Sequence, residues 1–195
     1  MRSTGLQLFQ SVAEGNPIFE PWTNLSNVLT DTGSVADCRL RDLAGATSRP
    51  ILATNRAGAG DVPSTATVKG VTVEVERRAT NGSGTARDLG VYLIIPPATA
   101  STAKMNGVVW PGTLTPISYG SPVDLWDEAL TPAIVNDPLF GVGVQCEEIG
   151  GVNAITAEVQ RIRVNVHYSG GGSRSGRGRR LRARPILQNL TGREP

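Results

Sequence analysis

The stretch VTVEVER at residues 71–77 alternates apolar and polar residues. Successive side chains of an extended strand point to opposite faces, so the three valines share one face while Thr72, Glu74 and Glu76 share the other. The stretch RIRVNVHY at residues 161–168 has the same period of two. Its inner row is Ile162, Val164, Val166 and Tyr168, and its outer row is Arg161, Arg163, Asn165 and His167. The two stretches predict half-buried strands of an all-β fold.

Further strands are expected on either side of these two. LGVYLII at residues 89–95 is nearly all apolar, which is typical of a strand covered on both faces. The segment NGSG at residues 81–84 is expected to join the 71–77 and 89–95 strands as a flexible hairpin loop. A third inner row is Phe140, Val142, Val144 and Cys146. Weaker strands are expected at residues 35–40, 49–53, 108–110 and 154–158.

The remaining segments set the domain boundaries. Residues 115–138 are not strand-like, and Thr131 followed by Pro132 predicts an N-cap and the first position of one short helical turn. Residues 1–20 are expected to form an N-terminal arm with at most one helical turn, and residues 169–195 a Gly/Arg-rich C-terminal arm. We therefore predict a single jelly-roll-like β-sandwich of about seven or eight strands at residues 21–168, with both arms extended.

Charge is distributed unevenly along the chain. The net charge of +2 divides into −4 for residues 1–168 and +6 for residues 169–195, whose composition is typical of a flexible linker followed by an arginine-rich segment. A segment of this kind cannot form its own core, so we expect it to contact another molecule. Its candidate binding residues are Arg174, Arg177, Arg179, Arg180, Arg182 and Arg184, with Ile186, Leu187 and Leu190 as an apolar anchor.

The partner of this arm has two candidate classes. Guanidinium groups pair with carboxylates, which favours an assembly arm that contacts acidic patches on other proteins. Arginines also neutralise phosphates, so nucleic acid is the less favoured alternative. No aromatic residue is interleaved with the arginines, so any binding of nucleic acid would be independent of sequence.

Catalytic interpretations find little support in the sequence. DTGS at residues 31–34 resembles the aspartic protease loop, but Thr30 interrupts the apolar run before Asp31, and a turn is favoured. A thiol mechanism would need His167, the single histidine, which is on an outer row whereas Cys146 is on an inner row. The thiols of Cys38 and Cys146 are expected to be free and buried. We expect no catalytic residues.

Other classes are excluded or disfavoured by composition. No apolar run approaches the 18 residues of a membrane-spanning helix, and the first 15 residues lack the apolar core of a secretory signal. Two cysteines cannot form a four-ligand zinc site. A solvated rim is favoured over a calcium site for the acidic loop residues, which are Asp124, Asp127, Glu128, Asp137, Glu147 and Glu148. We expect no cofactor and no metal.

Three stretches resemble a family of tailed-bacteriophage virion proteins. They are PWTNLSN followed by DTGSVA within residues 21–36, VKGVTVEVERRA at residues 68–79, and WPGTL, YGSPVDLW and TPAIVNDPLFGV within residues 110–142. The strand at residues 159–168 completes the pattern, and both arms lie outside it. The resemblance implies a non-enzymatic β-sandwich component of the particle.

The expected function is therefore structural. Decoration or cementing of the capsid is the first placement, and attachment at the head or neck comes next. Expected partners are the major capsid protein or head and tail subunits, together with further copies of the chain in a homo-oligomer. The expected location is the virion, assembled in the host cytoplasm, with no membrane contact. The alternative is a tail or head fibre module that binds host carbohydrate, if Trp110, Tyr119 and Trp126 are exposed for sugar stacking instead of closing the end of the sandwich.

Overall fold

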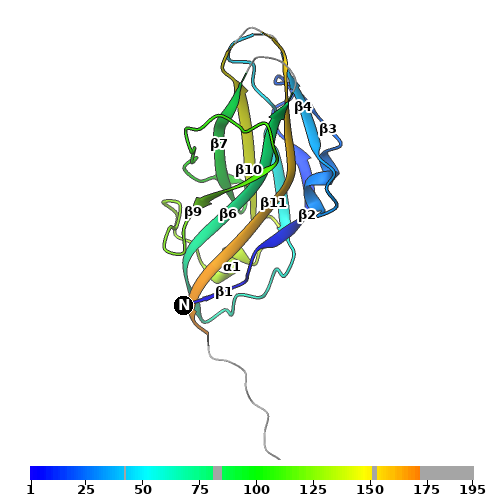
Figure 1. Ribbon diagram of the computed structural model, residues 1–195. Coiled ribbons are helices and arrows are strands. Elements are labelled where there is room, and N and C mark those ends of the chain that lie inside the picture. Colours follow the sequence, from blue (N-terminus) through cyan, green and yellow to red (C-terminus); the bar gives the residue numbers. More distant parts are fainter. Residues whose placement is uncertain (42, 81–84, 151–152, 172–195) are drawn as a thin grey trace, which may run out of the picture.

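The computed structural model describes residues 1–41, 43–80, 85–150 and 153–171, and in these residues every strand ladder is antiparallel (Figure 1). The strands are β1 (Arg2–Ser3), β2 (Gln7–Glu14), β3 (Trp22–Thr23), β4 (Ala36–Leu40), β5 (Ile51–Arg56), β6 (Ala66–Thr80), β7 (Ala86–Ile95), β8 (Thr99–Ala100), β9 (Thr115–Gly120), β10 (Gly141–Glu148) and β11 (Ile155–Gly170). A 3-10 helix, η1 (Leu25–Leu29), and one helical turn, α1 (Pro132–Val135), complete the elements. The all-β prediction is confirmed, and eight strands have five residues or more.

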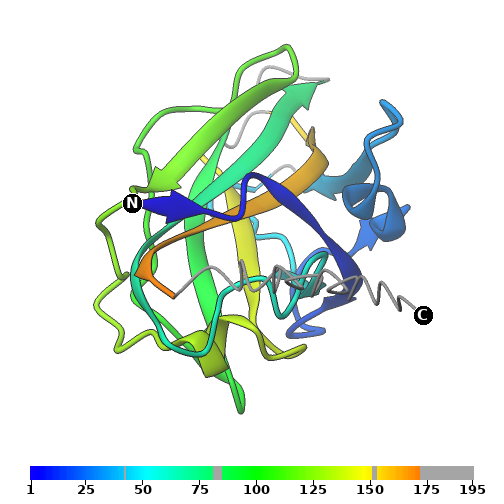
Figure 2. The same cartoon turned by 90° about the horizontal axis from the view of Figure 1, so that it is seen from below.

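The strands form two layers that share β2. Sheet A contains β3, β4, β11, β6 and β9, and one edge of β11 pairs in succession with β4, β2 and β1. Sheet B has the order β2-β5-β10-β7-β8. Because β2 pairs with both β11 and β5, the two layers are one curled sheet, which Figure 2 shows end-on. The result is a β-sandwich closed along one side.

The predicted inner rows form the core between the layers. Val71, Val73 and Val75 of β6 lie opposite Val166, Val164 and Ile162 of β11, and all six are fully buried. The row from Phe140 to Cys146 is also fully buried, from the sheet B side. In β6, burial alternates over residues 71–77 because successive side chains point to opposite faces, and burial of the apolar face stabilises the fold.

The N-terminal segment is part of the sandwich, so the prediction of an arm at residues 1–20 is wrong. β1 and β2 both pair with other strands, and Phe9 is only 2% exposed. The predicted break at Gly15, Asn16 and Pro17 does coincide with the end of β2. The predicted C-terminal arm lies largely outside the described residues, since β11 continues to Gly170 and the description stops at Gly171.

Two further predictions about connections are wrong. The β6 and β7 strands do not form a hairpin, because β6 pairs with β11 and β9 whereas β7 pairs with β10 and β8. The loop at residues 81–84 itself lies outside the described residues. Residues 115–120, expected not to be a strand, form β9. Pro116 is tolerated there because β9 is an edge strand that pairs only with β6.

The remaining predictions are partly confirmed. The strands expected at residues 154–158 and 161–168 are one long strand, β11, and residues 108–110 contain a single bridge from Val109 to Arg87. The Thr131 side chain caps α1 by accepting a hydrogen bond from Ile134 N at 3.3 Å, as expected. β7 is not covered on both faces, because Leu89 is exposed and Tyr92 is half-buried.

Candidate interaction surfaces

The three aromatic residues proposed for sugar stacking are buried. Trp110 and Tyr119 are each 4% exposed and Trp126 is fully buried, so none presents a ring face to solvent. Trp126 Nε1 donates to the Val71 carbonyl at 2.8 Å, which ties the segment after β9 to β6. The sugar-stacking assignment of these residues is therefore corrected: they close the sandwich.

Trp110 and Tyr119 instead surround a buried carboxylate. Trp110 Nε1 donates to Asp88 Oδ1 at 2.9 Å, and the Tyr119 hydroxyl donates to Asp88 Oδ2 at 2.7 Å. Arg77 Nη2 donates to Oδ2 at 3.1 Å, while Nη1 lies 2.9 Å from Oδ1 but off the line of a hydrogen bond. Burial raises the pKa of Tyr119, so its hydroxyl remains a donor. We call these four residues the Asp88 network.

The Asp88 network connects the two layers. Arg77 and Tyr119 come from β6 and β9 of sheet A, and Asp88 comes from β7 of sheet B. The Arg77 guanidinium also lies 4.9 Å from the Trp110 ring centroid, within range of a cation–π contact. Sequence analysis missed Arg77 and Asp88 as a pair. The available signal was their charge at inward positions of two otherwise apolar rows.

The residues weighed for catalysis are separated by the fold. Asp31 lies in an exposed turn and forms an ion pair with Arg161. Cys38 and Cys146 are free and fully buried, as predicted, and burial raises the pKa of both thiols, that of Cys146 to about 12. His167 lies on β11 in sheet A, where its Nε2 is 3.0 Å from Thr72 Oγ1, whereas Cys146 lies on β10 in sheet B.

The acidic residues show no metal site. Asp124 pairs with Lys104 at 2.9 Å, and Glu147 pairs with Arg87 at 2.7 Å. Among the residues that the structure describes, no group of three His, Cys, Asp or Glu side chains could hold a metal ion.

A cavity of about 680 Å³ is lined by Ser121, Val123, Asp124, Leu125, Asp127, Glu128 and Ala129.

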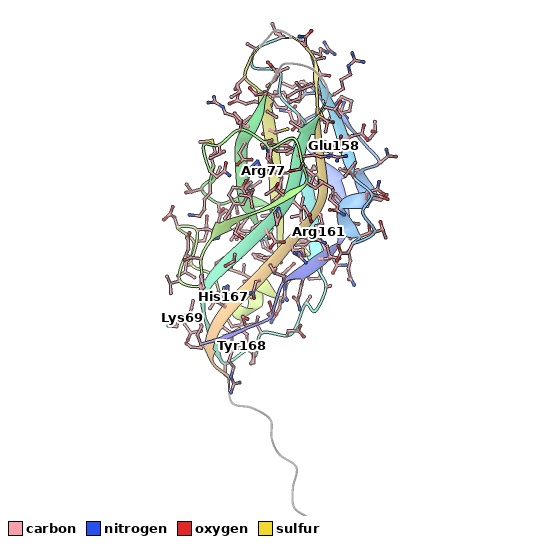
Figure 3. The ribbon with its side chains drawn as sticks, in the orientation of Figure 1. Lys69, Arg77, Glu158, Arg161, His167 and Tyr168 are labelled. Atoms are coloured by element: carbon pink, nitrogen blue, oxygen red, sulfur yellow. The ribbon has the colours of Figure 1, made fainter. Side chains whose placement is uncertain are left out.

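The outer face of sheet A is a ladder of ion pairs. Arg161 Nε lies 2.6 Å from Glu76, Arg163 Nε donates to Glu74 at 3.0 Å, and Arg78 pairs with Glu158 at 2.6 Å. Figure 3 labels Glu158, Arg161 and His167 along β11. We call these three pairs the sheet-A ladder. Its charges are satisfied within the chain.

The outer face of sheet B carries no charge over two cross-strand rows. Ladder register places Tyr92, Gly143, Leu52 and Ala13 in one row, and Ile94, Gly141, Thr54 and Ser11 in the next. We call these eight residues the sheet-B face. Beyond Gln145 the outer face is charged, because Arg87 pairs with Glu147 there.

Tyr92 and the two glycines shape the sheet-B face. A Cβ atom at Gly143 would lie 2.2 Å from the Tyr92 ring, so the ring lies directly over the Gly143 backbone. Partial burial raises the pKa of Tyr92. A cavity of about 230 Å³ beside the ring is lined by Leu52, Tyr92, Ile94, Ala98, Thr99 and Ala100. Sequence analysis missed this surface. The available signals were one tyrosine within residues 89–95 and glycines at alternate positions 141 and 143, but their pairing depends on the register of β7 with β10.

The predicted arm residues lie outside the described residues. These are Arg174, Arg177, Arg179, Arg180, Arg182, Arg184, Ile186, Leu187 and Leu190. In the part of the chain that is described, no helix has the length and apolar character needed to cross a membrane.

Comparisons with known proteins give little further information. No family model and no curated protein matches the chain. The fold is similar to a solved structure described as "CBM4 structure and function", with a TM-score of 0.38 and 10% sequence identity over 71% of this chain and 87% of that one. We draw no functional argument from a likeness of this degree.

Proposed function

We propose that the protein is a non-enzymatic structural component of a tailed-bacteriophage virion, held to neighbouring subunits through the sheet-B face and the C-terminal arm. Decoration or cementing of the capsid is the preferred placement, with attachment at the head or neck next. The observation that carries the proposal is the contrast between the charged outer face of sheet A and the uncharged sheet-B face.

The sheet-B face has the character of a contact surface. Antiparallel sheets commonly bury one face and expose a polar one, as sheet A does. Sheet B instead leaves Leu52, Tyr92 and Ile94 half-buried on its outer face, and the Tyr92 ring covers the buried Gly143 backbone. Contiguous apolar surface of this kind supports a partner that covers it. A neighbouring protein subunit with a flat, uncharged surface fits best.

The virion assignment rests on the sequence resemblance. Its third stretch, within residues 110–142, includes three buried aromatic residues and the helical turn α1. Trp110, Tyr119 and Trp126 are buried, and the TPAIVNDP segment forms α1 and its cap. These residues build the framework of the sandwich, so the resemblance is one of fold-forming residues. This supports a shared architecture with the virion proteins and leaves the contact surfaces free to differ.

The arm supplies the second contact. Residues 1–168 carry a net charge of −4 and residues 169–195 carry +6, so the arm of one subunit suits the acidic surface of another protein. Two linked contacts bind far more tightly than either alone, because the second forms at high effective concentration. A chain truncated after Gly171 should keep its fold and be incorporated poorly into particles.

The central experiment compares two matched charge insertions. Ser11→Arg places a cation on the sheet-B face, and Ser118→Arg places the same cation on β9 of sheet A; both serines are exposed. Ser11→Arg should be lost from purified particles while Ser118→Arg is retained, with both chains folded by circular dichroism. Normal incorporation of Ser11→Arg would refute the sheet-B face as the contact surface.

One observation favours a carbohydrate-binding module as the second candidate. Tyr92 is a half-buried aromatic ring on an uncharged surface beside a small cavity, an arrangement that suits stacking against a sugar. This alternative predicts glycan-array binding that is lost in Tyr92→Ala and kept in Tyr168→Ala, whose ring lies on sheet A. Absence of glycan binding by the parent chain would exclude it for the glycans tested.

A further inference from the structure

A third cavity opens at the end of the body that carries α1. It has a volume of about 400 Å³ and is lined by Pro96, Pro97, Ala133, Ile134, Asp137 and Leu139. This volume lies within the range of about 300–1,000 Å³ that is usual for ligand pockets. The walls are apolar apart from one carboxylate. We call it the α1 pocket.

The carboxylate of the α1 pocket is held in place and uncompensated. Asp137 Oδ1 accepts a hydrogen bond from Leu139 N at 2.8 Å, which fixes the side chain. No described residue forms an ion pair with Asp137. Leu139 is 55% exposed, although it lies between the cap of α1 and the first residue of β10. The lining therefore suits an aliphatic group next to a cation.

The end of the described chain lies close to this pocket. A Cβ atom at Gly171 would lie 2.8 Å from Pro63, so the two residues are in contact. The neighbouring Val62 carbonyl accepts from Asn136 Nδ2 at 2.7 Å, and Asn136 directly precedes Asp137. Figure 2, viewed from this end, shows α1 and the end of β11 on the same side of the molecule.

The chain beyond Gly171 contains a segment with matching chemistry. RPILQNL at residues 184–190 places an arginine immediately before a proline and two branched aliphatic residues. The 14 residues between Gly171 and Ile186 can span up to about 50 Å when extended. A folded body of this size has a radius of gyration of about 15 Å, so the segment can reach the pocket.

We propose that the α1 pocket binds residues 184–190 of the same chain, with Ile186 and Leu187 against its apolar walls and Arg184 beside Asp137. The chain's own segment is favoured over a neighbour's because a short tether gives a millimolar effective concentration, which exceeds that of other subunits in dilute solution. The proposal goes beyond the virion role: the free subunit holds its arm against its own body.

The test uses paramagnetic relaxation in the full chain. A nitroxide label is attached at Gln188→Cys, since the native thiols of Cys38 and Cys146 are fully buried. The amide signals of Ala133 and Leu139 should lose most of their intensity relative to the reduced label. Leu139→Asp should restore the Ala133 signal, and Val123→Asp, at an exposed apolar residue that does not line the pocket, should not.

Mixing experiments separate the two sources of the segment. Isotope-labelled chains without nitroxide are mixed with unlabelled chains that carry it. Signal loss in the mixture would mean that a neighbour's segment occupies the pocket, which overturns the proposal. Unchanged Ala133 and Leu139 signals in the doubly labelled chain would also overturn it. Because the readout is in solution, failure here leaves the particle-incorporation test of the virion role unaffected.

Discussion

The outer faces of the two sheets differ in how they meet their surroundings. The sheet-A ladder pairs each arginine with a glutamate on a neighbouring strand, so this face is complete within the chain. The sheet-B face offers Leu52, Tyr92 and Ile94 with no charged neighbour in either row. Under the proposed function, the outer face of sheet A is exposed to water and the sheet-B face makes the contact with a neighbouring subunit. The predictions below test this division of roles.

The largest effect is expected at the buried ion pair between Arg77 and Asp88, which connects the two layers. Asp88→Ala leaves the Arg77 guanidinium buried without its carboxylate, and removal of one partner from a buried pair costs about 3–5 kcal/mol. The measurement is the free energy of unfolding in urea. As a control, Arg77→Met combined with Asp88→Leu removes both charges and should cost much less. Equal losses in the single and double variants would show that packing, and not the ion pair, is responsible.

The next largest effect is expected from substitution of the two glycines of the sheet-B face, Gly141 and Gly143. A Cβ atom at Gly141 would lie 2.2 Å from the Ala53 carbonyl oxygen, so Gly141→Ala must shift the backbone and should cost about 1–3 kcal/mol. Gly143→Ala should cost less, because the half-buried Tyr92 ring can swing aside. Gly112→Ala, which meets open space, is the matched control. Urea unfolding that ranked Gly143→Ala above Gly141→Ala would contradict this description of the surface.

Sequence alternation predicted the strands but not their partners. The inner rows of β6, β10 and β11 follow from a local period of two, which depends only on the extended backbone. The strand after β6 could pair with β6 as a hairpin or cross to the other layer. Which of these occurs depends on contacts between residues distant in sequence. β2 is a similar case, since the burial of Phe9 depends on pairing with β5 more than 40 residues later.

The candidate surfaces were harder to predict for the same reason. An apolar run such as residues 89–95 is equally compatible with a strand covered on both faces and with one that leaves Tyr92 and Ile94 for a partner. Trp110 and Tyr119 attracted attention as aromatics, but their environment is set by Asp88, which is 22 and 31 residues away in the chain. Only the assembled layers show which rings are covered.

A smaller effect is expected from the sheet-A ladder. Glu74→Gln removes one charge of a partly exposed pair with Arg163, which should cost about 1 kcal/mol or less. The loss should shrink as salt is added, because salt screens pairs near the surface. Ser11→Arg on the uncharged sheet-B face should show no comparable salt dependence of unfolding. A Glu74→Gln effect that was independent of salt would mean that this pair acts as a buried one.

The smallest effect concerns His167, which lies at the end of the sheet-A ladder. Burial lowers its pKa in the folded chain below the usual 6.5, so the unfolded chain binds more protons between the two values. Stability should therefore be complete above pH 6.5 and decrease as the pH falls through the lowered pKa. The Thr72 hydroxyl lies 3.0 Å from Nε2, within hydrogen-bond distance. Urea unfolding at pH 7.5 and 5.5 should show a smaller pH dependence in His167→Gln than in the parent chain, and an unchanged dependence would assign the effect to the carboxylates of the ladder.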